Sequence, residues 1–125
     1  MEHAKVAVVV PIYNAERTLK SVFARIPSQI LGRISKFILI NDGSKDNTQN
    51  VIEDLRKNYN NLVVKVNHRN LGYGAVQKIG FKQALVDNMD IVVLLHADGQ
   101  YPPEVLAAII DPIEKNNADV VGGDR

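Results

Sequence analysis

The stretch that decides the fold is IVVLLHADGQYPPE, residues 91–104. Its five apolar residues, Ile91–Leu95, predict a strand buried on both faces of a sheet. Asp98 lies just beyond the carboxyl end of this expected strand, which is where open α/β sheets place ligand-binding groups. Pro102 bars continuation of the strand, and Pro103 suits the first turn of a helix. By itself, Asp98-Gly99 is more typical of an ordinary turn than of a ligand site, so the rest of the chain has to decide.

The same alternation of short apolar runs and helical patterns extends over the whole chain. Strands are expected at Val6–Pro11, Phe37–Ile40, Leu62–Val66 and Ile91–Leu95, with a fifth beginning at Asp119. Helices are expected at residues 16–26, around Val51–Leu55, at Tyr73–Val86 and from about Pro103 to Lys115. This order predicts the α/β class: a mostly parallel sheet with helices on both faces, a Rossmann-like three-layer αβα sandwich.

Composition narrows the class of protein further. A chain of 125 residues is typical of one domain, and a net charge of +1 gives no sign of a nucleic-acid partner. The absence of cysteine excludes disulfides and thiolate metal sites, which fits a reducing compartment. Uninterrupted apolar runs of about five residues are far below the ~20 needed to span a bilayer, and the N-terminus carries no signal-peptide pattern. We therefore expect a cytoplasmic domain.

Three loops follow expected strands and should meet at one edge of the sheet: Pro11–Glu16, Asn41–Thr48 and His96–Tyr101. They carry more carboxylates, amides and aromatic rings than turns require. Familiar nucleotide and hydrolase signatures are absent from the sequence: Gln77 stands where G-x-G-x-x-G needs its last glycine, and neither a P-loop nor G-x-S-x-G occurs. The edge is therefore a candidate ligand site of another kind.

Four motifs in order resemble the inverting glycosyltransferases of family 2, which have the GT-A fold. They are VVVPIYNAE at 8–16, ILINDGSKDNT at 38–48, NLG at 70–72 and HADGQYPPE at 96–104. The resemblance is greatest to the polyprenyl-phosphate sugar synthases, and the motifs span nearly the whole chain. It implies that residues 1–125 form the nucleotide-sugar-binding part of a GT-A domain whose C-terminal part lies beyond the sequence.

The resemblance also implies roles for individual residues. Pro11, Tyr13 and Glu16 match the first-strand loop that packs around the nucleobase and ribose of the donor. Asp42 matches the carboxylate that hydrogen-bonds the base. Asp98 matches the second aspartate of the family's D-x-D, which holds Mg²⁺ or Mn²⁺ on the donor diphosphate.

The remaining positions match the family less closely. Gln100 matches a residue that can join Asp98 on the metal, and Arg125 matches an arginine on the acceptor side, although Asp124 stands where the family has serine. His96 replaces the first aspartate of D-x-D; it is either a ligand, better suited to Mn²⁺ than to Mg²⁺, or a hydrogen-bonded structural residue. Both interpretations stay open, and no catalytic base is assigned within the chain.

The expected function is transfer of a sugar, with inversion, from a UDP- or GDP-sugar to an acceptor that resemblance suggests is a polyprenyl phosphate. A divalent metal suits this chemistry because it neutralises the charge that develops on the leaving diphosphate. The alternative is a non-catalytic nucleotide-binding module, or a domain that forms homo-oligomers through its sheet edge. A nucleotidyltransferase would need a loop rich in glycine and arginine at residues 12–16, which the sequence lacks. The full-length protein is expected to be cytoplasmic or membrane-associated.

Overall fold

The computed structural model describes residues 4–98 and 120–122. Its centre is a five-stranded sheet in the order β3-β2-β1-β4-β5, and all four strand pairings are parallel. The strands are β1 (Val6–Ile12), β2 (Lys36–Asn41), β3 (Leu62–Val66), β4 (Ile91–Leu94) and β5 (Val120–Gly122). The described helices are α1 (Leu19–Ala24), α2 (Ser28–Leu31), α3 (Thr48–Arg56) and α4 (Tyr73–Val86). The predicted parallel α/β sheet is confirmed.

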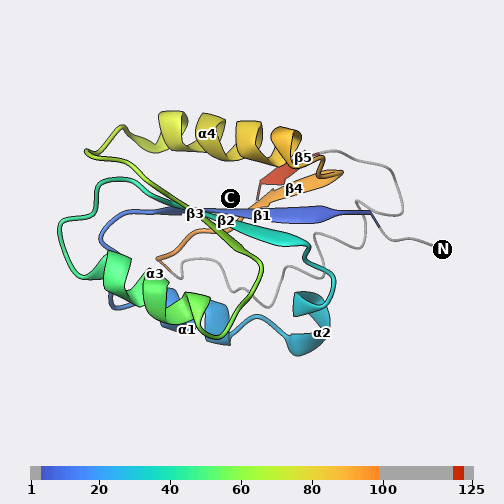
Figure 1. The fold of residues 1–125 in the computed structure, drawn as a ribbon, viewed down its shortest axis with the longest axis horizontal. Helices are drawn as coiled ribbons and strands as arrows, with labels where there is room; N and C mark the ends of the chain where they lie inside the picture. The colour runs from blue at the N-terminus through green and yellow to red at the C-terminus, as the bar shows by residue number, and fades with distance from the viewer. Residues whose placement is uncertain (1–3, 99–119, 123–125) are drawn as a thin grey trace.

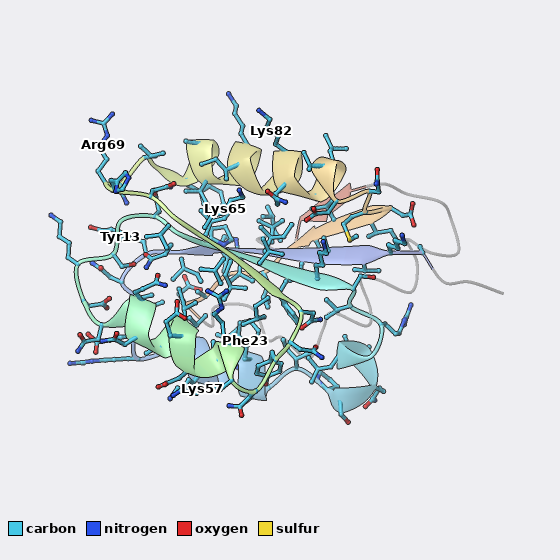
Figure 2. The ribbon with its side chains drawn as sticks, viewed as in Figure 1. Tyr13, Phe23, Lys57, Lys65, Arg69 and Lys82 are labelled. Atoms are coloured by element: carbon cyan, nitrogen blue, oxygen red, sulfur yellow. The ribbon has the colours of Figure 1, made fainter. Side chains whose placement is uncertain are left out.

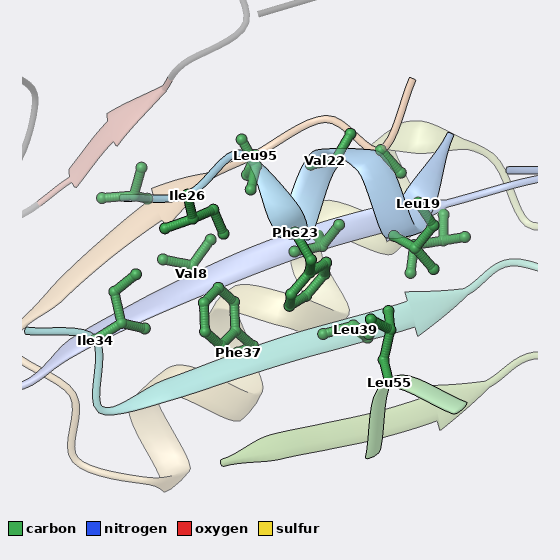
Figure 3. Packing of buried hydrophobic residues seen from close by; sticks show 14 of the residues in the cluster. Val8, Leu19, Val22, Phe23, Ile26, Ile34, Phe37, Leu39, Leu55 and Leu95 are labelled. Atoms are coloured by element: carbon green, nitrogen blue, oxygen red, sulfur yellow. The ribbon is translucent and has the colours of Figure 1, made fainter. Parts of the chain in front are cut away.

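Helices cover both faces of the sheet, so the predicted three-layer arrangement is confirmed as well. Figure 1 shows α1, α2 and α3 on one face and α4 on the other. The larger core lies on the first face, where Phe23 of α1 packs against Phe37 of β2 with ring centroids 5.0 Å apart (Figure 3). The smaller core lies under α4 and includes Val9, Ile40 and Val76. The central strand β1 is therefore buried from both sides, as its continuous apolar sequence requires.

Strand β1 continues through Pro11 instead of ending there, which differs from the prediction by one residue. The pairing of β1 with β4 stops at Val9, whereas the pairing with β2 continues to Ile12. Val9 O accepts a hydrogen bond from Leu95 N, so the backbone groups of Val9 are directed toward β4. Pro11, two residues later, is directed to the same side, but the paired part of β4 has already ended there. Proline is tolerated because its missing N–H leaves no gap in the ladder.

One predicted helix needs correction, and another lies outside the described residues. The helix expected at residues 16–26 is shorter, at Leu19–Ala24, because Ala15 O starts a turn that receives the N–H groups of Thr18 and Leu19. A short helix at Ser28–Leu31 was not expected. The predicted helix from about Pro103 to Lys115 lies outside the described residues. Among the described helices, none combines the length and apolar character that crossing a bilayer demands.

Helix α4 approaches the sheet closely because glycine occupies position 80. A Cβ atom on Gly80 would lie 2.4 Å from Val9 Cγ1 and 3.1 Å from Ile40 Cδ1, in a buried layer. We expect Gly80→Ala to lower the free energy of unfolding by about 1–2 kcal/mol, because overpacking outweighs the better helix propensity of alanine. Urea denaturation followed by circular dichroism measures the change.

Gly74 provides the matched control in the same helix, because a Cβ there would meet no atom within 4 Å. Gly74→Ala should therefore raise the free energy of unfolding by up to about 1 kcal/mol. If the two alanine variants were equally stable, the close packing of α4 on β1 would be contradicted.

The strand order places a ligand cleft at one point of the sheet. From β1 the chain moves outward to β2 and β3, then crosses back over β1 through α4 to form β4 on the other side. Strands β1 and β4 are neighbours, and the strands that follow them in the chain, β2 and β5, lie in opposite halves of the sheet. In open α/β sheets, such a switch in direction leaves a crevice outside the carboxyl ends of the strands.

Candidate functional site

A cleft of about 350 Å³ lies at this point, at the carboxyl ends of β1 and β4. It brings together four of the sequence-predicted site residues: Pro11, Tyr13, Asp42 and Asp98. The remaining lining residues are Ile12, Asn14, Ala15, Thr18, Asn70, Gly72, Tyr73, Val76, His96 and Ala97. Figure 2 shows Tyr13 and Arg69 toward the same end of the sheet. The predicted meeting of the strand-end loops is therefore present in the structure.

The two loops that follow β1 and β2 are tied together by hydrogen bonds. Asn14 N donates to Ser44 Oγ across 2.9 Å, and Lys45 N donates back to Asn14 Oδ1 across 2.8 Å. Asn14 takes a left-handed backbone conformation, with φ of 50°, which asparagine adopts more readily than most residues. This reciprocal pair fixes the loop that carries Tyr13 on the wall of the cleft.

Thr48, at the start of α3, anchors the same loops from inside the protein. Its hydroxyl accepts a hydrogen bond from Ala15 N at 2.8 Å and donates to Asp46 Oδ1. Asp46 Oδ1 also accepts from Thr48 N at 2.9 Å. Desolvation acts to raise the pKa of Asp46, but the hydrogen bonds from Thr48 and from the backbone N–H groups of Glu16 and Asp46 together lower that pKa below its ordinary value. Asp46 thus satisfies the N–H of the first residue of α3, and Thr48 ties the start of that helix to the loop after β1.

Removing the Thr48 hydroxyl should weaken both the fold and the cleft. We expect Thr48→Val to lower the free energy of unfolding by about 1–3 kcal/mol, because the buried N–H of Ala15 loses its acceptor. Thermal unfolding measures this loss. Thr48→Ser keeps the hydroxyl and should recover most of the stability; equal loss in both variants would assign the effect to the methyl group instead.

Glu16 lies at the contact between the loop after β1 and the loop after β2, and it does not line the cleft. Asn47 N donates to Glu16 Oε1 across 3.5 Å, and Glu16 N donates to Asp46 Oδ2 across 3.4 Å. A contact of Glu16 with the donor nucleotide stays a prediction.

Asp42 occupies the floor of the cleft, where it is only 4% exposed. Its Oδ1 accepts hydrogen bonds from Asn67 Nδ2 at 2.8 Å and from Leu71 N at 2.9 Å, while Oδ2 accepts from Gly72 N at 3.0 Å. The carboxylate therefore binds the segment that leads into α4, at the positive end of the helix dipole. A carboxylate can accept about four hydrogen bonds, so Oδ2 retains capacity for a donor group on a ligand.

The close approach of the β2–α3 loop to this segment requires glycine at position 43. Gly43 has a φ of 73°, and a Cβ atom there would lie 2.5 Å from the carbonyl carbon of Arg69. Any larger residue would push the two loops apart, and with them the donors that surround Asp42.

Asp98 is exposed on the opposite wall of the cleft, on the loop after β4. Thr18 Oγ1 donates to Ala97 O across 2.6 Å, which ties this loop to the turn before α1. A hard divalent cation prefers carboxylate oxygens, so Asp98 is the described side chain best suited to one. Among residues 4–98, no group of three or more His, Asp or Glu side chains is arranged to hold a metal ion.

One carboxylate would suit a divalent ion if the phosphates of a ligand completed its coordination, because one or two protein carboxylates then suffice. Gln100 and Arg125 lie outside the described residues, so their proposed places in the site stay predictions.

His96 faces Tyr73, a residue whose importance was not recognised from the sequence. The rings stack with centroids 5.6 Å apart at an angle of 20°, and Tyr73 Oη lies 3.3 Å from His96 Nε2. This contact favours the structural interpretation of His96 over the ligand interpretation, since Nε2 is directed at a phenol. The available signal in the sequence was an aromatic residue directly after the Asn70-Leu71-Gly72 motif, at the first position of a helix.

Sequence comparison finds relatives that match nearly the whole of this chain. The chain is 34% identical over 123 residues to the dolichol-phosphate mannosyltransferase of Pyrococcus furiosus, covering 97% of this chain and 33% of the relative. It is 32% identical over 129 residues to the UDP-N-acetylglucosamine–dolichyl-phosphate N-acetylglucosaminyltransferase of Methanococcus voltae, covering 94% and 50% respectively. The chain thus spans between a third and a half of the length of these relatives.

Solved structures show the same fold. The mannosyltransferase PcManGT of Pyrobaculum calidifontis, in complex with GDP-Man and Mn²⁺, superposes with a TM-score of 0.71 at 18% identity, covering 90% of this chain and 33% of the other. TarS (residues 1–349) of S. aureus, in complex with UDP-GlcNAc, gives a TM-score of 0.70 at 24% identity, covering 90% and 32%. The sequence model of Glycosyl transferase family 2 matches residues 7–125, and the chain belongs to that family.

Proposed function

We propose that this chain binds the nucleoside-diphosphate part of a UDP- or GDP-sugar and serves as the donor half of an inverting glycosyltransferase. The observation that carries the proposal is the cleft in which Tyr13, Asp42 and Asp98 meet at the carboxyl edge of a parallel sheet. Membership of the family supports the reaction class.

The cleft offers a separate environment for each part of such a donor. Pro11 and the half-exposed ring of Tyr13 provide apolar surface for a flat nucleobase, and Asp42 Oδ2 provides an acceptor for one of its N–H groups. Asp98 stands on the other wall, where it would hold Mg²⁺ or Mn²⁺ against the diphosphate with Gln100. When bound, that ion supplies Lewis-acid neutralisation of the leaving diphosphate.

The proposed reaction is a single displacement at the anomeric carbon of the sugar. An acceptor oxygen attacks the anomeric carbon of the sugar from the side opposite the diphosphate, and the bond to the diphosphate oxygen breaks, which inverts the configuration. The named relatives with dolichyl-phosphate substrates favour a polyprenyl phosphate as the acceptor. A phosphate oxygen is already anionic, so it attacks without a strong general base, whereas a hydroxyl acceptor would need one. No residue of this chain is assigned as that general base.

Calorimetric titration with UDP and GDP, each with and without Mn²⁺, tests the proposal. We expect one of the two nucleotides to bind, and to bind more tightly when Mn²⁺ is present. A folded sample that releases no heat with either nucleotide would contradict the proposed donor site.

A non-catalytic nucleotide-binding module is the second candidate, and one observation favours it. His96 replaces a carboxylate of the family's D-x-D, and its ring is engaged with Tyr73, so among the described residues Asp98 is the only carboxylate on its wall of the cleft. Transfer of radiolabelled sugar to a polyprenyl phosphate by the full-length protein separates the candidates: transfer supports the enzyme, and nucleotide binding without transfer supports the module.

A further inference from the structure

The stacked pair of Tyr73 and His96 joins the two chain segments that carry the carboxylates of the cleft. Tyr73 directly follows Gly72, whose N–H binds Asp42 Oδ2 at 3.0 Å. His96 precedes Asp98 by two residues on the loop after β4. The pair therefore links the Asp42 end of the cleft to the Asp98 end, and both of its members line the cleft.

The group that lies between the base and the diphosphate of a nucleotide is the ribose. If Asp42 faces the base and Asp98 the diphosphate, as the proposed function has it, the ribose hydroxyls fall beside the pair. A hydroxyl needs a partner that can donate or accept a hydrogen bond, held in a fixed position. The near-parallel stack of the two rings, at 20°, restricts the Tyr73 side chain to such a position.

Tyr73 Oη keeps a hydrogen-bonding capacity in either protonation arrangement of the pair. If Tyr73 donates to His96 Nε2, its oxygen lone pairs remain to accept from a ribose hydroxyl. If Nε2–H donates to Tyr73, the phenol O–H remains to donate to the ribose. The phenol is also accessible, since Tyr73 is 43% exposed at the start of α4.

We propose that Tyr73, held by His96, is the residue that recognises the ribose of the donor and sets the preference for ribonucleotides over deoxyribonucleotides. This inference rests on the proposed function, because it takes the direction of the nucleotide from Asp42 and Asp98. It assigns His96 a positioning role through Tyr73 instead of a place on the metal.

Calorimetry with the nucleoside diphosphate that binds, UDP or GDP, and with its 2′-deoxy and 3′-deoxy forms tests the inference. We expect the wild-type chain to bind the ribonucleotide about 5- to 10-fold more tightly than at least one deoxy form, the magnitude of one net hydrogen bond. Tyr73→Phe should lose that factor for the ribonucleotide and leave the affinity for this deoxy form unchanged, so that the ratio approaches one. His96→Phe should lower the ratio as well, because the phenol loses its anchor.

Tyr59→Phe is the matched control. Tyr59 packs against Phe23 at 5.3 Å in the core on the α1–α3 side, away from the cleft, and its variant should keep the wild-type ratio. A Tyr73→Phe variant that preserves the ratio, or a wild-type chain that binds all three forms equally, would overturn the inference while leaving nucleotide binding intact. Failure of the wild-type chain to bind any nucleotide would instead refute the proposed function and this inference together.

Discussion

Asp98→Asn is expected to weaken Mn²⁺-dependent binding of UDP or GDP by on the order of 100-fold. The variant keeps the size of the side chain but removes the negative charge that a hard cation requires. The expected loss is large because the described residues include no cluster of three ligating side chains that could hold the ion without Asp98. Calorimetric titrations of nucleotide in buffer with saturating Mn²⁺ measure the effect.

The sign of the effect should change when the metal is removed. In buffer with a chelator, the Asp98 carboxylate repels the donor diphosphate, so Asp98→Asn should bind the nucleotide at least as tightly as the wild-type chain. Asp54→Asn is the control, because Asp54 pairs with Lys20 at 3.2 Å on the exposed surface of α3 and lies outside the cleft. Equal Mn²⁺ dependence in the wild-type chain and Asp98→Asn would contradict the proposed metal role.

Asp42→Ala should lower the free energy of unfolding by about 3 kcal/mol, the largest loss of stability expected from one residue of the site. The variant leaves Leu71 N, Gly72 N and the amide of Asn67 without their acceptor in a partly buried position. It also removes the negative charge at the N-terminal end of α4. Urea denaturation measures the loss, and Asp42→Asn should recover part of it because one carbonyl oxygen remains.

Asp90→Ala is the control for this prediction. Asp90 accepts one hydrogen bond at its side chain from Lys5 N at 2.8 Å, in an exposed position, and its removal should cost less than about 1 kcal/mol. An Asp42→Ala variant as stable as Asp90→Ala would mean that the carboxylate does not hold the start of α4. Asp42→Asn should also lose most nucleotide binding, which calorimetry on the folded variant measures separately from its stability.

Helix α4 illustrates where sequence patterns are insufficient. Its bounds were predicted as Tyr73–Val86, and the structure agrees. Spacing alone suggests Val76, Ile79, Phe81 and Leu85 as its apolar set, but Leu85 is 73% exposed and the buried positions are Val76, Gly80 and Ala84. The helix carries apolar residues on several sides, so periodicity leaves its rotation open. The close approach at Gly80 then selects the face with small residues.

The site shows the same division. The sequence alone determined the alternation of strands and helices, because continuous β-branched runs and polar loops are local patterns. It also determined that Asp42 and Asp98 follow strands whose carboxyl ends lie at the same edge of the sheet. Only the tertiary structure decided what those side chains contact: that Asp42 already binds the segment before α4, and that His96 faces Tyr73. The physical reason is that hydrogen bonds between residues some 20 to 30 positions apart depend on how loops are packed together, which no local pattern records.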